Sequence, residues 1–324
     1  MNNFTVIVPS KHLDDLTRNC LSCCRELYPD IQIILILNQV ESLSDESAKF
    51  LDSLSIESHL LSNATIGRMR NYAAAKSVGD YLAFIDSDAY PQVGWLESAC
   101  GILRRNTSNI ITGPNINFPD ASFQQSLTFK VTFSPFVSGG SSWLKNKNHE
   151  GFVTTASSCN LIVCKHLYIS NKGMDEELIT GEDLEFCHRM TKKGEKIFFS
   201  KETLVFHRNR NFKGFLLQRF VWGHSSFALI KKSADLKFIY TLLPGIAALL
   251  AITSFFFLPF KILLITLSII FLLTLIDSLR LASNFFHVPF LLLLIWGGAL
   301  MVSIGNLRGY CQNTGLYFYY KNND

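Results

Sequence analysis

The sequence has little net charge, no basic leader and no internal repeat. Its 324 residues carry a formal net charge of +4, which is too small to indicate a nucleic-acid partner. The N-terminal residues Met1 to Phe4 include no basic region and only a short apolar run follows, so they do not form a secretory signal. These features indicate an ordinary folded head that stays in the cytoplasm.

The glycine and cysteine patterns exclude two common kinds of site. No G-x-G-x-x-G follows the first predicted strand, Phe4 to Pro9, so a dinucleotide-binding fold is not supported. Cys20 and Cys23 form a C-x-x-C pair, but no second pair with zinc-binding spacing accompanies it. The pair lies in a predicted helix, 16–27, so we interpret its thiols as packed side chains. Free thiols fit a reducing compartment.

Charge is nearly absent from the last third of the chain, which is rich in Leu, Ile and Phe. A helix that crosses a bilayer core needs about 20 apolar residues. Three stretches meet or approach this length: 238–258, 260–276, where Lys261 can snorkel, and 288–305. Buried core helices are the alternative, but three runs with almost no polar face are hard to solvate otherwise. We therefore predict a transmembrane region, 238–324, with about three helices.

The segment before this region, 212–237, combines Phe, Leu and Trp with basic neighbours. This composition is typical of an amphipathic helix at a membrane surface. Lys231, Lys232 and Lys237 flank the first predicted span, and lysines gather on the cytoplasmic side of membranes. The sequence thus predicts a multi-pass protein of the cell (inner) membrane, with membrane lipids as partners and a cytoplasmic catalytic domain.

The first 211 residues alternate apolar strands with helices. Ile31 to Leu37 and Tyr81 to Ile85 are predicted strands, and Ile66 to Ser77 is a predicted helix. This rhythm predicts an α/β domain with a parallel sheet in a Rossmann-like half. Residues 115–151 are aromatic and Ser-rich without a clear period, and we predict an irregular, mobile substrate loop there.

The tripeptide Asp86-Ser87-Asp88 follows the predicted strand Tyr81 to Ile85. Two carboxylates one residue apart at the end of a strand can bind one hard cation, which can in turn hold a diphosphate. In open α/β sheets, ligands bind outside the carboxyl ends of the strands. The alternative is an ordinary solvated turn, because Pro91 follows closely.

Five motifs in order resemble those of the family 2 glycosyltransferases, which have the GT-A fold with a mixed sheet. They are Gly67-Arg68-Met69-Arg70-Asn71, Gly79-Asp80-Tyr81, Phe84-Ile85-Asp86-Ser87-Asp88, Gly173-Met174-Asp175-Glu176 and Gly181-Glu182-Asp183-Leu184-Glu185. As a joint set they are specific, although each alone is weak. The resemblance covers roughly residues 4–210 and implies a catalytic domain, 1–211, that uses a nucleotide-sugar and a divalent metal, Mn²⁺ or Mg²⁺.

The resemblance also implies roles for single residues. Asp183, with Glu182 beside it, matches the general base of an inverting transfer. The implied metal ligands are Asp86, Asp88 and His207, and the implied substrate- or nucleotide-binding residues are Pro9, Asn38, Arg70, Asp86, Arg208 and Arg219. Asn38 stands where the family usually has an acidic residue against the base, so UDP is assigned by analogy alone.

Several of these roles have a structural alternative. Arg70 can instead form an ion pair on a helix surface. Glu182 and Asp183 can serve only the N-terminus of their helix. His207 can be a hydrogen-bonded or solvated side chain, and Arg208 and Arg219 can contact anionic lipid headgroups instead of an acceptor phosphate.

The leading hypothesis is a membrane-anchored, inverting, metal-dependent glycosyltransferase. It would move a sugar from a nucleotide-sugar to a lipid-linked or glycan acceptor in cell-surface polysaccharide or glycoconjugate synthesis. Two alternatives stay open: a polyprenyl-phosphate sugar synthase, whose acceptor is the phosphate itself, and a catalytically inactive membrane scaffold. The predicted spans contain no internal charge, which disfavours a transporter.

Overall fold

The computed structural model describes residues 3–105, 107–138, 146, 148–233, 235–243, 246 and 260–311. The chain forms two compact units. The first comprises Met1–Ile116 and Leu144–Arg208, and the second comprises Asn117–Trp143 and Asn209–Asp324. The second unit therefore takes a segment from the middle of the chain in addition to the C-terminal part.

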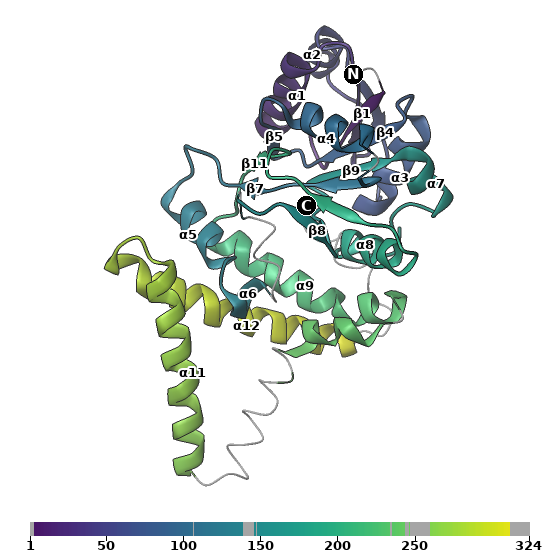
Figure 1. Cartoon of the computed structure of the whole chain (residues 1–324). Coiled ribbons are helices and arrows are strands. Elements are labelled where there is room, and N and C mark those ends of the chain that lie inside the picture. The colour runs from purple at the N-terminus through teal and green to yellow at the C-terminus, as the bar shows by residue number, and fades with distance from the viewer. Residues whose placement is uncertain are drawn as a thin grey trace. The chain divides into compact units, whose positions relative to one another are not determined.

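An eight-stranded mixed sheet forms the centre of the first unit (Figure 1). Its strands, in spatial order, are β3 (Glu57–Leu60), β2 (Gln32–Leu37), β1 (Phe4–Ser10), β4 (Tyr81–Ile85), β9 (Asn160–Cys164), β6 (Ile110–Thr112), β10 (Ile197–Phe199) and β8 (Gly151–Val153). The strands β9 and β8 run antiparallel to their neighbours, and the other pairs are parallel. The predicted α/β fold with a Rossmann-like mixed sheet is confirmed.

Helices cover both faces of this sheet, which explains why its central strands are nearly continuous apolar runs. Alternate residues of β1 and β2 point to two separate apolar clusters. One cluster packs against α1 (Asp15–Leu27), α2 (Asp45–Ser53) and α4 (Trp95–Arg104). The other packs against α3 (Ile66–Lys76), α7 (Lys165–Ser170) and α8 (Glu182–Lys192).

The strand order reverses between β1 and β4. From β1 the chain adds β2 and β3 on one side, whereas β4 lies on the other side. The strand β1 pairs with β2 as far as Ser10 but with β4 only as far as Ile7, so β1 and β4 are no longer paired at their carboxyl ends. Ligands of open α/β sheets bind at such a reversal.

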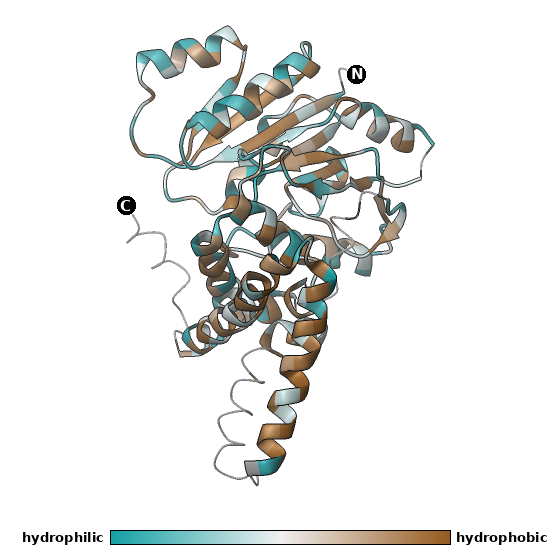
Figure 2. Cartoon of the chain, turned by 90° about the vertical axis from the view of Figure 1, so that its left-hand side faces the viewer, coloured by the Kyte–Doolittle hydropathy of each residue, from teal (hydrophilic) through white to brown (hydrophobic). Residues whose placement is uncertain are grey.

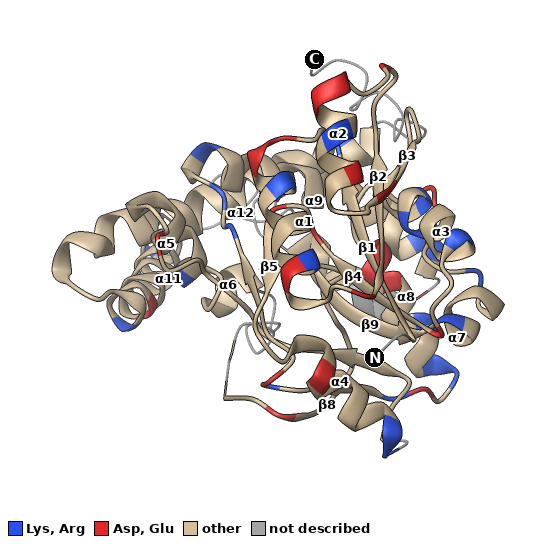
Figure 3. Cartoon of the chain, turned by 90° about the horizontal axis from the view of Figure 1, so that it is seen from above, with Lys and Arg blue, Asp and Glu red and all other residues tan. Residues whose placement is uncertain are grey.

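A three-stranded sheet begins directly after the Asp86-Ser87-Asp88 turn. It consists of β5 (Ala89–Pro91), β11 (Val205–His207) and β7 (Asn115–Ile116), in that spatial order. The register pairs Ala89 with His207, so the end of β11 lies beside the turn that carries the two carboxylates. Acidic and basic residues are both spread over the helices of the first unit, which fits the small net charge (Figure 3).

The described part of the second unit is helical. It contains α5 (Phe123–Val131), α6 (Pro135–Ser138), α9 (Phe212–Ser233), η2 (Leu236–Leu242), α11 (Phe260–Leu281), η3 (Phe285–His287) and α12 (Val288–Cys311). The prediction that 115–151 is irregular was wrong for α5 and α6. A capping box between Ser122 and Gln125 starts α5. Residues 139–145 and 147 lie outside the described part.

Glycines allow α9 and α12 to cross at very short distance. A Cβ atom added to Gly223 of α9 would lie 2.2 Å from the Val302 carbonyl oxygen, and one added to Gly305 of α12 would lie 2.2 Å from that of Phe220. Small residues at such crossings let two helix backbones pack closely. The buried side of α9 therefore faces α12, and its placement at a membrane surface stays a prediction.

Within the described residues, two helical segments are long and apolar enough to cross a membrane, Lys261–Leu281 and Phe285–Cys311. Most of α11 is apolar over its whole circumference (Figure 2). These segments coincide with the second and third predicted spans. Of the first predicted span, 238–258, residues 244–245 and 247–258 lie outside the described residues.

Candidate active site

Two carboxylates lie at the carboxyl end of β4, where the strand order reverses. Asp86 and Asp88 follow Ile85, the last residue of the strand, and their side chains are 30% and 32% exposed. The position is the one predicted from the sequence, since β4 ends where its apolar run ends. Partial exposure leaves both carboxylates open to a ligand outside the sheet.

Arg70 lies at the centre of this site. It comes from α3, and its side chain is only 1% exposed. One guanidinium nitrogen is 2.8 Å from Asp86 Oδ1, and another is 2.8 Å from Glu182 Oε1. The alternative of an ion pair on a helix surface was therefore wrong. Arg70 ties the carboxylate at the end of β4 to the start of α8.

The first turn of α8 presents Asp183 beside this ion pair. Gly181 precedes the helix with a φ of 87°, in the left-handed region that glycine adopts without strain. Asp183 is partly exposed, and its Oδ2 accepts a hydrogen bond from Ser158 N at 3.0 Å. Its Oδ1 accepts from Leu184 N at 2.8 Å. Two backbone N–H groups thus orient this carboxylate, and the N-terminus of α8 favours its negative charge.

Acidic groups outnumber basic groups at this site. The pKa of Glu182 is raised to about 7, first by burial and then by the charge of Asp183, while Arg70 opposes the shift. Burial also raises the pKa of Asp86, with Arg70 lowering it and Asp88 raising it. One arginine cannot balance the carboxylates of Asp86, Asp88, Glu182 and Asp183, so the site has an excess of negative charge that a divalent cation would offset.

His207 joins the carboxylates at the end of β11. Its Nε2 is 3.3 Å from Asp88 Oδ1, and the backbone N–H of Arg208 donates to Asp88 O at 2.9 Å. Carboxylate and imidazole donors suit Mn²⁺, and carboxylates suit Mg²⁺. The residues Asp86, Asp88 and His207 therefore fit the predicted divalent metal by chemistry and by charge.

Cys159 was not predicted in this neighbourhood. A ligating atom of Asp86, the Cys159 sulfur and a ring nitrogen of His207 all lie within 4.8 Å of one another. Burial raises the pKa of the Cys159 thiol well above its usual range. The register that pairs Ile85 of β4 with Asn160 of β9 brings Cys159 beside Asp86, and no local pattern in the sequence could have shown it.

Two other predicted residues lie at the carboxyl ends of β1 and β2. Pro9 is buried in β1, beyond the last pair with β4. Asn38 follows β2, and both groups of its amide are bonded to the backbone of Ala64. Its Nδ2 donates to the carbonyl oxygen at 2.9 Å, and its Oδ1 accepts from the N–H at 3.1 Å.

Arg219 belongs to the second unit. It is 5% exposed, and its Nη1 donates to Val137 O at 3.0 Å. Its guanidinium carbon lies 4.4 Å from the centre of the Trp222 ring and 4.8 Å from that of Phe215. Burial lowers the pKa of Arg219 to about 10. These contacts account for the side chain within the packing of α9.

Asn71 and Asn160 hold the site together but were not singled out from the sequence. Asn71 donates from Nδ2 to Met174 O at 2.8 Å and accepts at Oδ1 from Met174 N at 3.0 Å. Asn160 accepts from Trp95 Nε1 at 2.9 Å and donates to Thr203 O at 2.7 Å. Asn71 was visible as the last residue of its motif, whereas nothing local marked Asn160.

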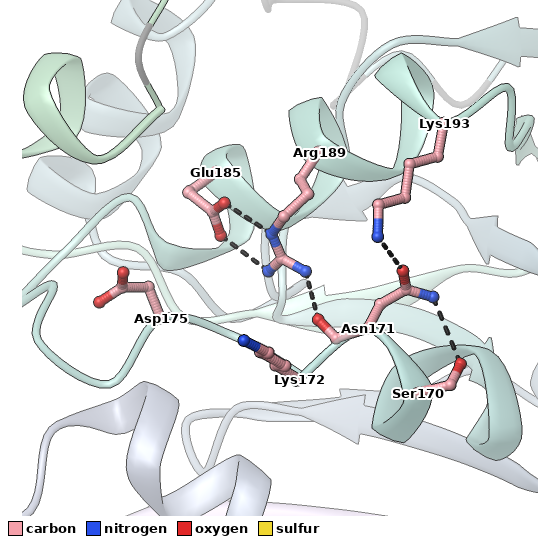
Figure 4. Close-up of a pocket in the computed structure, with 7 residues that line it drawn as sticks. All are labelled: Ser170, Asn171, Lys172, Asp175, Glu185, Arg189 and Lys193. Atoms are coloured by element: carbon pink, nitrogen blue, oxygen red, sulfur yellow. Dashed lines mark hydrogen bonds and ion pairs between the residues drawn. The ribbon is translucent and has the colours of Figure 1, made fainter.

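A separate pocket of about 340 Å³ lies over α7 and α8 (Figure 4). It is lined by Ser170, Asn171, Lys172, Asp175, Glu185, Arg189 and Lys193. Arg189 is bonded to both carboxylate oxygens of Glu185 and to the Asn171 carbonyl (Figure 4). Asp86 and Asp88 do not line this pocket, and the guanidinium of Arg189 is already paired with Glu185. We therefore assign no substrate to the pocket.

Comparison with known proteins finds similarity to glycosyltransferases. Residues 5–160 match the family model described as Glycosyl transferase family 2. A Pre-mycofactocin glycosyltransferase of Mycobacterium tuberculosis is 25% identical over 176 residues, which are 51% of this chain and 35% of that protein. The chain thus spans about a third of the length of this relative.

Two further proteins match most of the chain. The Dolichyl N-acetyl-alpha-D-glucosaminyl phosphate 3-beta-D-2,3-diacetamido-2,3-dideoxy-beta-D-glucuronosyltransferase of Methanococcus voltae is 24% identical over 246 residues, covering 72% of this chain and 75% of that protein. The crystal structure of S. aureus TarS 1-349 in complex with UDP-GlcNAc has a TM-score of 0.52 at 14% identity, covering 96% and 92% of the two chains, and shows the same fold. The family model and these relatives support the resemblance to the family 2 glycosyltransferases that the sequence motifs indicated.

Proposed function

We propose that this chain is a membrane-anchored, inverting, metal-dependent glycosyltransferase that moves a sugar from a nucleotide-sugar to a lipid-linked or glycan acceptor. One observation carries the proposal. The carboxylates of Asp86, Glu182 and Asp183 gather around the buried Arg70 at the reversal point of the sheet, in the fold of the family. A site with excess negative charge at this edge suits a divalent cation and the diphosphate it would hold.

Asp86, Asp88 and His207 would hold the metal, Mn²⁺ or Mg²⁺. When bound, the cation would supply positive charge against the leaving nucleoside diphosphate. Pro9 and Asn38 lie at the carboxyl ends of β1 and β2, and Arg208 follows β11 beside Asp88; all three are assigned to the donor side. The UDP-GlcNAc complex named for TarS supports a UDP-sugar as the first donor to test.

Asp183 takes the proton from the acceptor hydroxyl. The N–H groups of Ser158 and Leu184 fix its two oxygens, and its partial exposure leaves it open to an acceptor. A positioned carboxylate acting as general base contributes about 10²–10⁴-fold to such a reaction. Glu182 is buried against Arg70, so we assign it the positioning of the first turn of α8 rather than contact with substrate.

The apolar helices support a membrane anchor and a membrane-bound acceptor. Along α11, large side chains such as Ile265, Phe271 and Leu272 are more than half exposed, a surface that lipid solvates better than water. The Methanococcus voltae relative is named for transfer to a dolichyl N-acetylglucosaminyl phosphate, a sugar already linked to a lipid. An anchored head would meet such an acceptor at high effective concentration on the cytoplasmic face of the cell membrane, in cell-surface glycan synthesis.

The test is release of nucleoside diphosphate by the full chain in detergent, with a panel of nucleotide-sugars, Mn²⁺ or Mg²⁺, and a membrane lipid extract. We expect release from one donor, lost with EDTA and lost in Asp88→Asn. Asp52→Asn is the matched control, because Asp52 is an exposed aspartate of α2 in the same unit. No release from any donor would support the inactive scaffold instead.

The polyprenyl-phosphate sugar synthase is separated by a second variant. A phosphate acceptor carries no proton that must be removed during attack, so Asp183→Asn would keep its transfer rate. Transfer to a hydroxyl would instead fall at least about 10²-fold. Analysis of the lipid product shows which acceptor atom carries the sugar.

A further inference from the structure

Three side chains of different chemistry converge at the end of β4, and one of them is a thiol. Ligating atoms of Asp86, Cys159 and His207 lie within 4.8 Å of one another. They come from the ends of three different strands: Asp86 follows β4, Cys159 precedes β9, and His207 ends β11. The registers that pair Ile85 with Asn160 and Ala89 with His207 fix this convergence in the backbone.

The thiol changes which metals the site can hold. Mg²⁺ prefers oxygen ligands, and Mn²⁺ accepts oxygen and imidazole nitrogen. Thiolate, imidazole and carboxylate together are the ligands of Zn²⁺. Cys159 is 3% exposed, so it does not reach bulk solvent and faces the site from the core side.

We propose that Asp86, Cys159 and His207 form a mixed-donor site for a soft divalent cation of the Zn²⁺ type. This site rests on the proposed function, because it shares Asp86 and His207 with the proposed Mn²⁺ or Mg²⁺ site. A soft cation would therefore compete with the Mn²⁺ or Mg²⁺ ion that supports sugar transfer. On binding, a bond forms between the cation and the Cys159 sulfur, and the thiol proton passes to solvent without any redox change. The fourth position stays open to water or to a diphosphate oxygen.

The geometry requires only side-chain adjustment. Bonds of about 2.3 Å to sulfur and about 2.0–2.1 Å to nitrogen hold two ligands roughly 3.5 Å apart in a tetrahedral site. The present separations are at most 4.8 Å. The Cys159 and His207 side chains can close this difference by rotation about their χ angles, while the strands stay in place.

The test measures metal binding by the full chain in detergent, without donor or acceptor. Co²⁺ is added as a spectroscopic probe, and Zn²⁺ affinity is measured against a chromophoric chelator. We expect a sulfur-to-cobalt charge-transfer band in the near ultraviolet that disappears in Cys159→Ser. Zn²⁺ binding should weaken by more than about tenfold in that variant, because even outer-shell changes cost about 10–100-fold in affinity. Mn²⁺ binding should stay unchanged.

Cys164→Ser is the matched control, since Cys164 lies at the opposite end of the same strand β9. It should keep both the band and the Zn²⁺ affinity. If Cys159→Ser fails to fold, Cys159→Ala replaces it, because alanine leaves no buried hydroxyl without a partner, and it should likewise lose the band and weaken Zn²⁺ binding more than about tenfold.

Three results would overturn the proposal. They are a cobalt band that survives in the Cys159 variant, a Zn²⁺ affinity equal to that of wild type, and equal losses of Zn²⁺ and Mn²⁺ affinity in that variant. Binding is measured without turnover, so its failure is distinct from a failure of sugar transfer. A chain that binds Zn²⁺ through Cys159 but releases no nucleoside diphosphate would contradict the proposed function and leave this site standing.

Discussion

Replacing Arg70 by methionine tests the charge balance on which the site depends. Arg70 is 1% exposed and bonds Asp86 and Glu182, each at 2.8 Å. Methionine fills part of the same volume but leaves both carboxylates without a cation. Removing one partner of a buried ion pair costs about 3–5 kcal/mol. In a unit of this size each kcal/mol lowers Tm by about 2–4 °C, so we expect Tm to fall by about 6–20 °C.

The loss should grow as the pH rises. Without the arginine, the pKa values of Asp86 and Glu182 rise further above those of the unfolded chain. A carboxyl whose folded pKa is raised stabilises the fold at low pH, and this stability is lost as the pH rises through the folded pKa. Burial already raises the pKa of Glu182 to about 7 in the presence of Arg70. The deficit of Arg70→Met should therefore be larger at pH 8 than at pH 6.

The assay is thermal unfolding of the full chain in detergent with EDTA, followed by intrinsic fluorescence. Arg68→Met is the matched control, because Arg68 lies on the same helix α3 and is exposed. Exposed substitutions usually change stability by less than about 0.5 kcal/mol. If Arg70→Met unfolds within about 2 °C of this control at pH 8, or if its deficit shrinks with rising pH, the reasoning is refuted.

Other perturbations give equally definite results. Asp183→Asn should lower sugar transfer at least about 10²-fold while donor affinity, measured by calorimetry, stays unchanged. Glu182→Gln should abolish the loss of stability that wild type shows as the pH rises from 4.5 to about 7, because in this range the folded wild type binds more protons than the unfolded chain; thermal unfolding at pH 5 and pH 8 in EDTA measures the difference. Gly223→Ala should destabilise the second unit by about 1–3 kcal/mol, because its Cβ would lie 2.2 Å from Val302 O. Gly297→Ala is the control for this change, since only the flexible Leu216 side chain is near, at 3.1 Å, and equal melting of the two variants would contradict the packing argument.

The elements with strong local signals could be predicted from the sequence. Tyr81–Ile85 was predicted as a strand and has the same bounds in the structure, because an apolar run between polar residues marks a strand buried on both faces. The short strands β5 and β7 were missed. They have only three and two residues, and their conformation is set by pairing with β11 rather than by a local pattern. The helix α5 was not predicted, although Ser122 and Gln125 have the spacing of a capping box.

At the site, too, local features could be predicted and contacts between distant segments could not. Asp86 and Asp88 could be located because the end of a strand is a local feature with a known consequence in α/β sheets. The burial of Arg70 and the nearness of Cys159 to Asp86 could not, because both depend on which distant strands and helices become neighbours. Arg70 and Glu182 are 112 positions apart in the sequence, and nothing in either segment shows that they meet.

The helix α3 explains why the motifs of this chain occur together. Gly67 lets the helix approach the turn after Gly173, where an added Cβ would lie 2.7 Å from Asp175 O. One turn later, Arg70 binds the carboxylates of Asp86 and Glu182, and the next residue, Asn71, bonds the backbone of Met174. One helical face thus contacts the Asp-Ser-Asp turn, the Gly-Met-Asp-Glu turn and the start of α8. A change in any of these segments alters a group that α3 must pair, which makes the motif set a physical unit rather than a list of independent signals.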